Sequence, residues 1–180
     1  MSEYSRVPAK AGTSLDGAPS RLRPPPSRGI KFAGYAALFG IPDADRDTIL
    51  PGAFSATLAQ KAETGARLPL YWQHRANQRI GWIDMAREDA RGLRVVASLD
   101  PGTRPAELLG AREVSGLSFG YRAKDFRITP AGRELRAVEL FEVSLVTHPL
   151  QHGARVHWFS DPHPTGEGDH AQHGGGARAP

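Results

Sequence analysis

Short apolar runs separated by glycine, aspartate and proline occupy the chain from residue 30 to residue 159, and they constrain the fold more than any other feature. Runs of this length, bounded by turn-forming residues, are typical of β-strands. No long spacing of the kind that βαβ units need separates them, which favours an antiparallel sheet or barrel. We predict strands over residues 30–39, 67–74, 79–87, 92–99, 115–126, 134–147 and 154–159.

Helical signals are confined to two segments, residues 52–63 and 105–113. Thr103 is a suitable N-cap for the second helix, and Pro105 would lie in its first turn, where a missing backbone N–H is tolerated. The sequence therefore predicts a mainly β fold with helical insertions (α+β), built around a small antiparallel β barrel.

The two ends of the chain differ in composition from the segment between them. Residues 1–28 contain the Pro24–Pro26 run and no hydrophobic period, and residues 160–180 are dominated by glycine and histidine. Neither segment has enough apolar content to offset the entropy of ordering it. We expect a disordered N-terminal arm, one folded domain over residues 29–159 and a flexible C-terminal tail.

Composition narrows the classes of function. The sequence has no cysteine, which excludes disulfides, thiol nucleophiles and thiolate metal sites. It also has no apolar run near the roughly 20 residues that cross a bilayer, and no secretory signal at its N-terminus, so we expect a cytoplasmic protein without a membrane partner. The net charge is +4, but the arginines are dispersed among acidic residues, so no specific nucleic-acid partner is predicted.

Ser118 is the candidate nucleophile. In the predicted strand SGLSFGY, alternation places Leu117 and Phe119 on one face, and Ser118 on the other between two glycines. A substrate backbone could approach a serine flanked by glycines closely, although such a serine also occurs where strands simply pack tightly. Ser115, at the start of the strand, is a weaker candidate.

His74 and Glu142 are candidate partners for a serine. His74 follows the apolar run LPLYW and precedes a polar loop, and histidine can accept a proton near neutral pH. Glu142 interrupts the apolar run ELFEVSLVT, where alternation groups it with Leu140 and Ser144. A carboxylate in such a strand needs a partner, and a histidine would suit it.

Five segments together resemble the tailed-phage prohead protease family. They are FAGYAALFGIPDADRDTILPGAFSATL, LPLYWQH, IGWIDMAREDARGLRVVASL, SGLSFGYR and LFEVSLVTHP, and they span roughly residues 30–156. The string Gly116-Leu117-Ser118-Phe119-Gly120 also matches the nucleophile elbow of α/β-hydrolases. That fold requires a helix directly after the serine, whereas YRAKDF continues as a strand.

The resemblance implies a relative of the herpesvirus assembly protease, with a small β barrel surrounded by helices. It implies a serine endopeptidase in which Ser118 is the nucleophile, His74 the general base and Glu142 the third catalytic residue, with no cofactor or metal. The substrate would be the scaffolding segment of the major capsid protein inside an assembling prohead in the host cytoplasm. Self-cleavage at the flexible ends and self-association are further expectations.

Other interpretations remain open from the sequence. The same barrel could serve as a non-catalytic capsid-assembly or scaffold module, in which case Ser118 would be dispensable for processing. A metal-dependent hydrolase could use His148, His152 and His157, although Pro149 and Gly153 argue against the helix that would align them. Donors to a reaction oxyanion are not identified by the sequence; Arg155 is one candidate.

Overall fold

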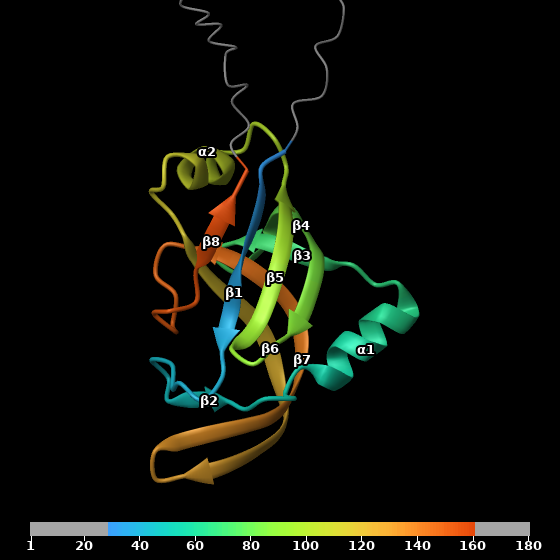
Figure 1. Ribbon diagram of the computed structural model, residues 1–180, viewed down its shortest axis with the longest axis vertical. Coiled ribbons are helices and arrows are strands. Elements are labelled where there is room, and N and C mark those ends of the chain that lie inside the picture. The colour runs from blue at the N-terminus through green and yellow to red at the C-terminus, as the bar shows by residue number, and fades with distance from the viewer. Residues whose placement is uncertain (1–28, 161–180) are drawn as a thin grey trace, which may run out of the picture.

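A computed structural model of the chain describes residues 29–160 (Figure 1). The predicted arm at residues 1–28, and the predicted tail apart from Ser160, lie outside the described residues. Most of the described chain is strand. The elements in chain order are β1 (Lys31–Leu38), β2 (Asp47–Ile49), α1 (Ser55–Thr64), β3 (Leu68–Trp72), β4 (Arg75–Glu88), β5 (Gly92–Leu99), α2 (Arg104–Gly110), β6 (Gly116–Thr129), β7 (Gly132–Val146) and β8 (Val156–Phe159).

Every predicted strand and both predicted helices are confirmed; β5 has the predicted ends, and the other elements are shifted at one or both ends. Thr103 is the N-cap residue of α2 and Pro105 lies in its first turn, as predicted, although the Thr103 hydroxyl donates to the Asp100 carbonyl and caps no helical N–H. The prediction missed β2, because three residues are too few to show a period. It also began β4 at residue 79, since the polar sequence before it carries no apolar alternation.

All the strands belong to one curled sheet. Its path is β2–β7–β3–β4–β5–β1–β8, and β6 pairs with β7 on the remaining side. The two ends of the sheet meet at one corner, where Gly116 forms a bridge with Arg155 and the Leu117 N–H donates to the Ala154 carbonyl at 2.9 Å. The sheet is therefore a half-barrel whose two ends contact each other at one place, where β6 begins and the chain leads into β8.

The predicted antiparallel barrel surrounded by helices needs correction. β2 and β3 both pair with β7 in parallel, so the sheet is mixed. Three pairs of neighbouring strands, β3–β4, β4–β5 and β6–β7, do pair antiparallel, but the spacing of the runs says nothing about partners that are distant along the chain. Within residues 29–160 only α1 and α2 are helical, and Figure 1 shows them at opposite sides of the sheet.

One hydrophobic core fills the concave side of the sheet and draws buried residues from β1 through β7 and from α2. Phe54 shows how the helical segments attach: it is fully buried and packs edge-on against Phe119 of β6, with 5.3 Å between ring centroids. No helix in the described part of the chain is long and apolar enough to cross a membrane.

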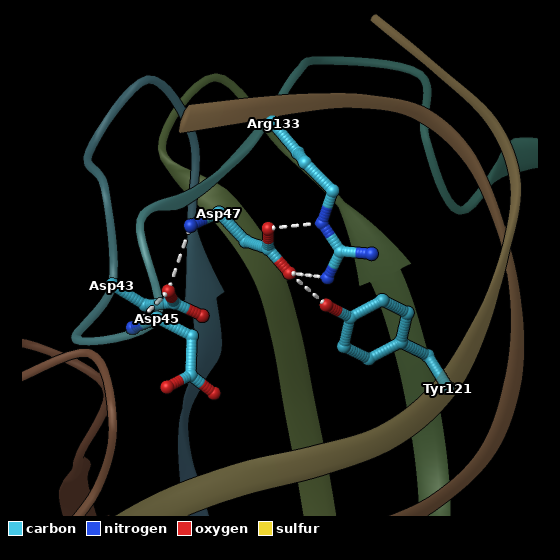
Figure 2. Close-up of polar contacts among 5 residues, drawn as sticks. All are labelled: Asp43, Asp45, Asp47, Tyr121 and Arg133. Atoms are coloured by element: carbon cyan, nitrogen blue, oxygen red, sulfur yellow. Dashed lines mark hydrogen bonds and ion pairs between the residues drawn. The ribbon is translucent and has the colours of Figure 1, made fainter. Parts of the chain in front are cut away.

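A buried ionic cluster fixes the short strand β2 to the β6–β7 hairpin (Figure 2). Asp47 is 2% exposed, and its Oδ1 accepts from Arg133 Nε at 2.7 Å while its Oδ2 accepts from Arg133 Nη2 and from the Tyr121 hydroxyl. Burial alone would raise the pKa of the Asp47 carboxyl, but the hydrogen bonds from Arg133 and Tyr121 outweigh it and hold that pKa below its usual value.

Replacing Arg133 with methionine should destabilise the fold at neutral pH by about 2 kcal/mol, because Asp47 would remain buried without its cation. The loss should not be larger, since the arginine side chain is half-exposed and its charge is partly screened by solvent. The lowered pKa of Asp47 stabilises the fold above the unfolded-state value of about 3.9, and this contribution is lost as the pH falls through the folded-state value. The difference between the two proteins in urea unfolding should therefore shrink below about pH 4.

Arg127→Met is the matched control on the same hairpin. Arg127 pairs with Glu134 at 2.6 Å, but this pair is exposed and contributes at most about 1 kcal/mol. Equal losses for the two variants at pH 7 would contradict the role of the buried cluster.

Candidate active site

His74 lies in the tight turn between β3 and β4, not at a strand end as predicted. Trp72 pairs with Arg75, so Gln73 and His74 form a two-residue hairpin loop. Both have positive φ, 53° and 58°, as in type I′ turns, where glycine or asparagine is usual. The turn is held against β7, because the Gln73 N–H donates to the Leu145 carbonyl and the His74 N–H donates to Ser144 Oγ, each at 3.1 Å.

Glu142 of β7 receives the His74 ring. Its Oε1 lies 2.6 Å from His74 Nδ1, and its Oε2 accepts from Ser144 Oγ at 2.7 Å. An ionised carboxylate can only accept, so Nδ1 donates and Nε2 of a neutral ring is left as an acceptor. Glu142 is 7% exposed, whereas the His74 side chain is 44% exposed, so a buried acid orients a ring that is open to solvent.

A β-bulge in β7 modifies the alternation expected around Glu142. Leu140 and Glu142 pair with successive residues of β6, which leaves Phe141 unpaired and 42% exposed. Leu140 therefore lies in the hydrophobic core with Val143 and Leu145, and the prediction that it shares a face with Glu142 is wrong. The predicted grouping of Glu142 with Ser144 is correct.

Ser118 lies beside this pair on β6. It is directly opposite Ser144 in the antiparallel register, and opposite residues project from the same face of a sheet. Glu142 is opposite Gly120, two positions further along β6, so Ser118 and Glu142 are diagonal neighbours whose side chains start about 7 Å apart. Within residues 29–160 no hydrogen bond joins Ser118 Oγ to His74; catalytic hydrogen bonds of this kind often tighten only when substrate binds.

The glycines that flank Ser118 make room for β7. A Cβ at Gly120 would lie 2.6 Å from Glu142 Oε1, and one at Gly116 would lie 2.5 Å from the Val146 carbonyl oxygen. Gly120 thus permits the carboxylate to reach His74. We expected these glycines to admit substrate, whereas their space is taken by the neighbouring strand.

Two further candidates have partners outside this group. Ser115 Oγ accepts from Arg155 Nη1 at 3.1 Å, and Arg155 Nε donates to the His152 carbonyl at 2.9 Å. Arg155 therefore links Ser115 to the loop that leads into β8, and this contact occupies the Ser115 hydroxyl.

The three histidines considered as metal ligands do not converge. His157 packs edge-on against Tyr35, with 5.7 Å between ring centroids, and burial together with the charge of Arg91 lowers its pKa. His148 Nδ1 lies 3.0 Å from the hydroxyl of the adjacent Thr147. In the described part of the chain, no three histidine, aspartate or glutamate side chains are arranged to hold a metal ion.

Comparison with known proteins assigns the chain to a family. Residues 21–165 match the model of the caudovirus prohead serine protease family. The chain belongs to this family. The resemblance inferred from the five segments is therefore confirmed, and the residues described above lie within the matched region.

Individual relatives agree with this assignment. The prohead protease of Enterobacteria phage HK97 is 34% identical over 133 residues, which is 69% of this chain and 58% of the relative. The capsid polyprotein of Pseudomonas phage PAJU2 is 28% identical over 127 residues, 64% of this chain and 18% of the polyprotein. The chain thus spans little more than half of one relative and a small part of the other.

The fold is shared with a solved structure. The bacteriophage T4 capsid assembly protease aligns with a TM-score of 0.54 at 14% identity, over 66% of this chain and 81% of that protein. The varicella-zoster virus protease aligns with a TM-score of 0.49 at 16% identity, over 71% and 63% of the two chains.

Proposed function

We propose that this chain is a serine endopeptidase of capsid maturation, with Ser118 as nucleophile, His74 as general base and Glu142 as the residue that orients the histidine. The observation that carries the proposal is the 2.6 Å contact between His74 Nδ1 and the buried Glu142 carboxylate, on the sheet face from which Ser118 projects. Membership of the prohead serine protease family supports it.

The mechanism follows from which atoms remain available. His74 Nδ1 is engaged by Glu142, so Nε2 is the atom that takes the proton from Ser118 Oγ as the oxygen attacks the peptide carbonyl. The Glu142 carboxylate stabilises the imidazolium that forms. His74 then returns the proton to the leaving amine, and water releases the acyl group by the same route. Backbone N–H groups near Ser118 would stabilise the oxyanion, each contributing about 3 kcal/mol.

The proposed substrate is the scaffolding segment of the major capsid protein, cleaved inside an assembling prohead, with self-cleavage in residues 1–28 and 160–180. Similarity to a segment of a phage capsid polyprotein supports a capsid-protein partner. The test is co-expression with the cognate major capsid protein, followed by mass analysis of the capsid protein's N-terminus. A capsid protein that keeps its full mass beside folded protease would contradict the proposed substrate.

The Ser144 hydroxyl on β7 contacts both His74 and Glu142, the two residues proposed to act with Ser118. It accepts from the His74 backbone N–H and donates to Glu142 Oε2, and Ser144 is fully buried. Strand alternation alone, which places Ser144 beside Glu142, predicts a mild effect for Ser144→Ala. The two hydrogen bonds change that expectation, because their loss frees both the turn and the carboxylate.

Ser144→Ala should lower kcat about tenfold and leave KM nearly unchanged, since Ser144 would act by positioning His74 and Glu142. Ser144→Thr retains the hydroxyl and should restore most of the lost turnover. Turnover per folded molecule should be measured, with folding checked by thermal unfolding. Equal turnover for the alanine and threonine variants would show that the hydroxyl has no positioning role.

A further inference from the structure

Arginines gather on the outer face of the sheet, where β4 turns into β5. Arg87 of β4 lies directly opposite Arg94 of β5, and Arg94 lies opposite Tyr35 of β1. Opposite residues project from the same face of a sheet. Leu93 and Val95, on either side of Arg94, are fully buried in the core. The two arginines and the tyrosine therefore point away from the core.

The turn between the two strands adds a third arginine. The Arg91 guanidinium carbon lies 4.9 Å from the centroid of the Tyr35 ring, a cation–π contact that holds this charge beside the other two. Arg87 and Arg91 are exposed, and Arg94 is partly buried. We call these three arginines the β4–β5 arginine cluster.

Neither helix of the described chain covers the cluster. Figure 1 shows β1, β5 and β4 nearest to the viewer, with α1 beside β4 and α2 at the end of β5 that is remote from the turn. The outer face of the sheet is thus open to solvent at this corner.

The cluster has little acidic compensation. The ion pairs within residues 29–160 use other basic residues. Asp89 lies in the same turn, but its Oδ2 accepts from the Tyr35 hydroxyl at 2.7 Å, and its Oδ1 accepts from the Arg91 N–H at 2.8 Å. The Tyr35 hydrogen bond lowers the pKa of the Asp89 carboxyl, so Asp89 is charged at neutral pH. One carboxylate therefore lies beside three guanidinium groups.

Arg87 and Arg94 repel each other, because like charges directly opposite on neighbouring strands destabilise a sheet. The adjacent Glu88 does not relieve the repulsion. Its carboxylate instead accepts from the backbone N–H groups of Gly52 and Phe54 before α1, at 3.0 and 2.7 Å. An anion bound between the two arginines would remove the repulsion.

The chemistry of the cluster favours carboxylates over nucleic acid. A guanidinium group binds a carboxylate through two parallel hydrogen bonds, and stacking on an aromatic ring orients it. Single-stranded nucleic acid is instead bound by stacking its bases on open aromatic rings. Arg91 already lies over Tyr35. Trp82, a second aromatic residue of the outer face, has the guanidinium carbons of Arg67 and Arg79 over its ring, 4.5 and 4.7 Å from the centroid.

We propose that the β4–β5 arginine cluster docks an acidic segment of a partner protein, with carboxylates of the segment bound by Arg87, Arg91 and Arg94. The docking surface is separate from the proposed catalytic residues, because His74 immediately precedes β4 and Arg87 lies near the far end of that strand. Docking therefore leaves the turn of His74 open and requires none of the proposed catalytic roles.

The test measures the binding of three labelled probes of equal length to the full chain at low salt, by fluorescence anisotropy. The probes are a peptide of alternating glutamate and serine, a peptide of alternating lysine and serine, and oligothymidylate. We expect the glutamate peptide to bind at least tenfold more tightly than the lysine peptide, and more tightly than oligothymidylate. Its affinity should fall as added salt screens the charges.

Replacing Arg87 and Arg94 together with glutamine should weaken binding of the glutamate peptide at least tenfold. This double variant should fold, and its midpoint of thermal unfolding should not decrease, because the change removes a like-charge pair. The matched control is Arg104→Gln with Arg127→Gln, which removes the same net charge from exposed arginines that are already in ion pairs. The control should keep the affinity within twofold.

Equal weakening in the two double variants would show that net charge alone attracts the peptide, and would overturn the docking site. Tighter binding of oligothymidylate than of the glutamate peptide would assign the surface to nucleic acid instead. Failure of the glutamate peptide to bind at low salt would also contradict the proposal. Each of these outcomes leaves the proposed peptidase function standing.

Discussion

Replacing Ser118 with alanine should abolish trimming of a co-expressed capsid protein, lowering turnover on the order of 10⁴-fold or more, while the fold remains intact. The effect is large because the variant lacks the hydroxyl that, in the proposed mechanism, forms the acyl intermediate. The fold should tolerate the change, since the hydroxyl is small and no hydrogen bond within residues 29–160 depends on it. Mass analysis of the capsid protein and of the protease itself measures both proposed cleavages, and thermal unfolding checks the fold.

Ser115→Ala is the control for the nucleophile. Ser115 lies three residues before Ser118, but its hydroxyl accepts from Arg155 and its loss should reduce turnover only severalfold. A reversal of the two effects would assign the nucleophile to Ser115. Capsid protein that is trimmed normally by folded Ser118→Ala would favour the alternative, a non-catalytic capsid-assembly module.

The strands of this fold could be predicted because their residues are half-buried and alternate, as β5 shows most clearly over Gly92–Leu99. Their partners could not be predicted to the same extent. β3 pairs in parallel with β7, although three strands and a helix lie between them in the sequence. Such a pairing depends on how the sheet curls, which local patterns do not encode.

The candidate site, like the fold, could be predicted from the sequence only in part. The chemistry of the residue types pointed to Ser118, His74 and Glu142, and their catalytic roles stay predictions, although the structure brings all three to one face of the β6–β7 pair. No pattern in the sequence indicated that Ser144 bridges His74 and Glu142, because one of its hydrogen bonds is to a backbone N–H in a distant turn.

Glu142→Gln should lower turnover about 10²-fold and leave KM almost unchanged. Glutamine keeps the size of the side chain and an oxygen that can accept from His74 Nδ1, but it lacks the charge that stabilises the imidazolium formed during attack. The expected loss is smaller than that for Ser118→Ala, because the half-exposed histidine ring is also stabilised by water. Turnover per folded molecule and KM should be measured with the same peptide substrate.

The rival role for Glu142 is structural. A buried acid can be retained for an ion pair with an arginine, and its loss would then lower stability and affect activity only through the folded fraction. In the described chain the ion-pair partner of Glu142 is His74, which favours the catalytic role. Glu139→Gln is the matched control: Glu139 lies on the same strand and pairs with the exposed Arg122 and Lys124, so its loss should leave turnover unchanged. Near-normal turnover in folded Glu142→Gln would reduce the proposed machinery to a Ser118–His74 dyad, and the carboxylate would then serve only to hold the turn against β7.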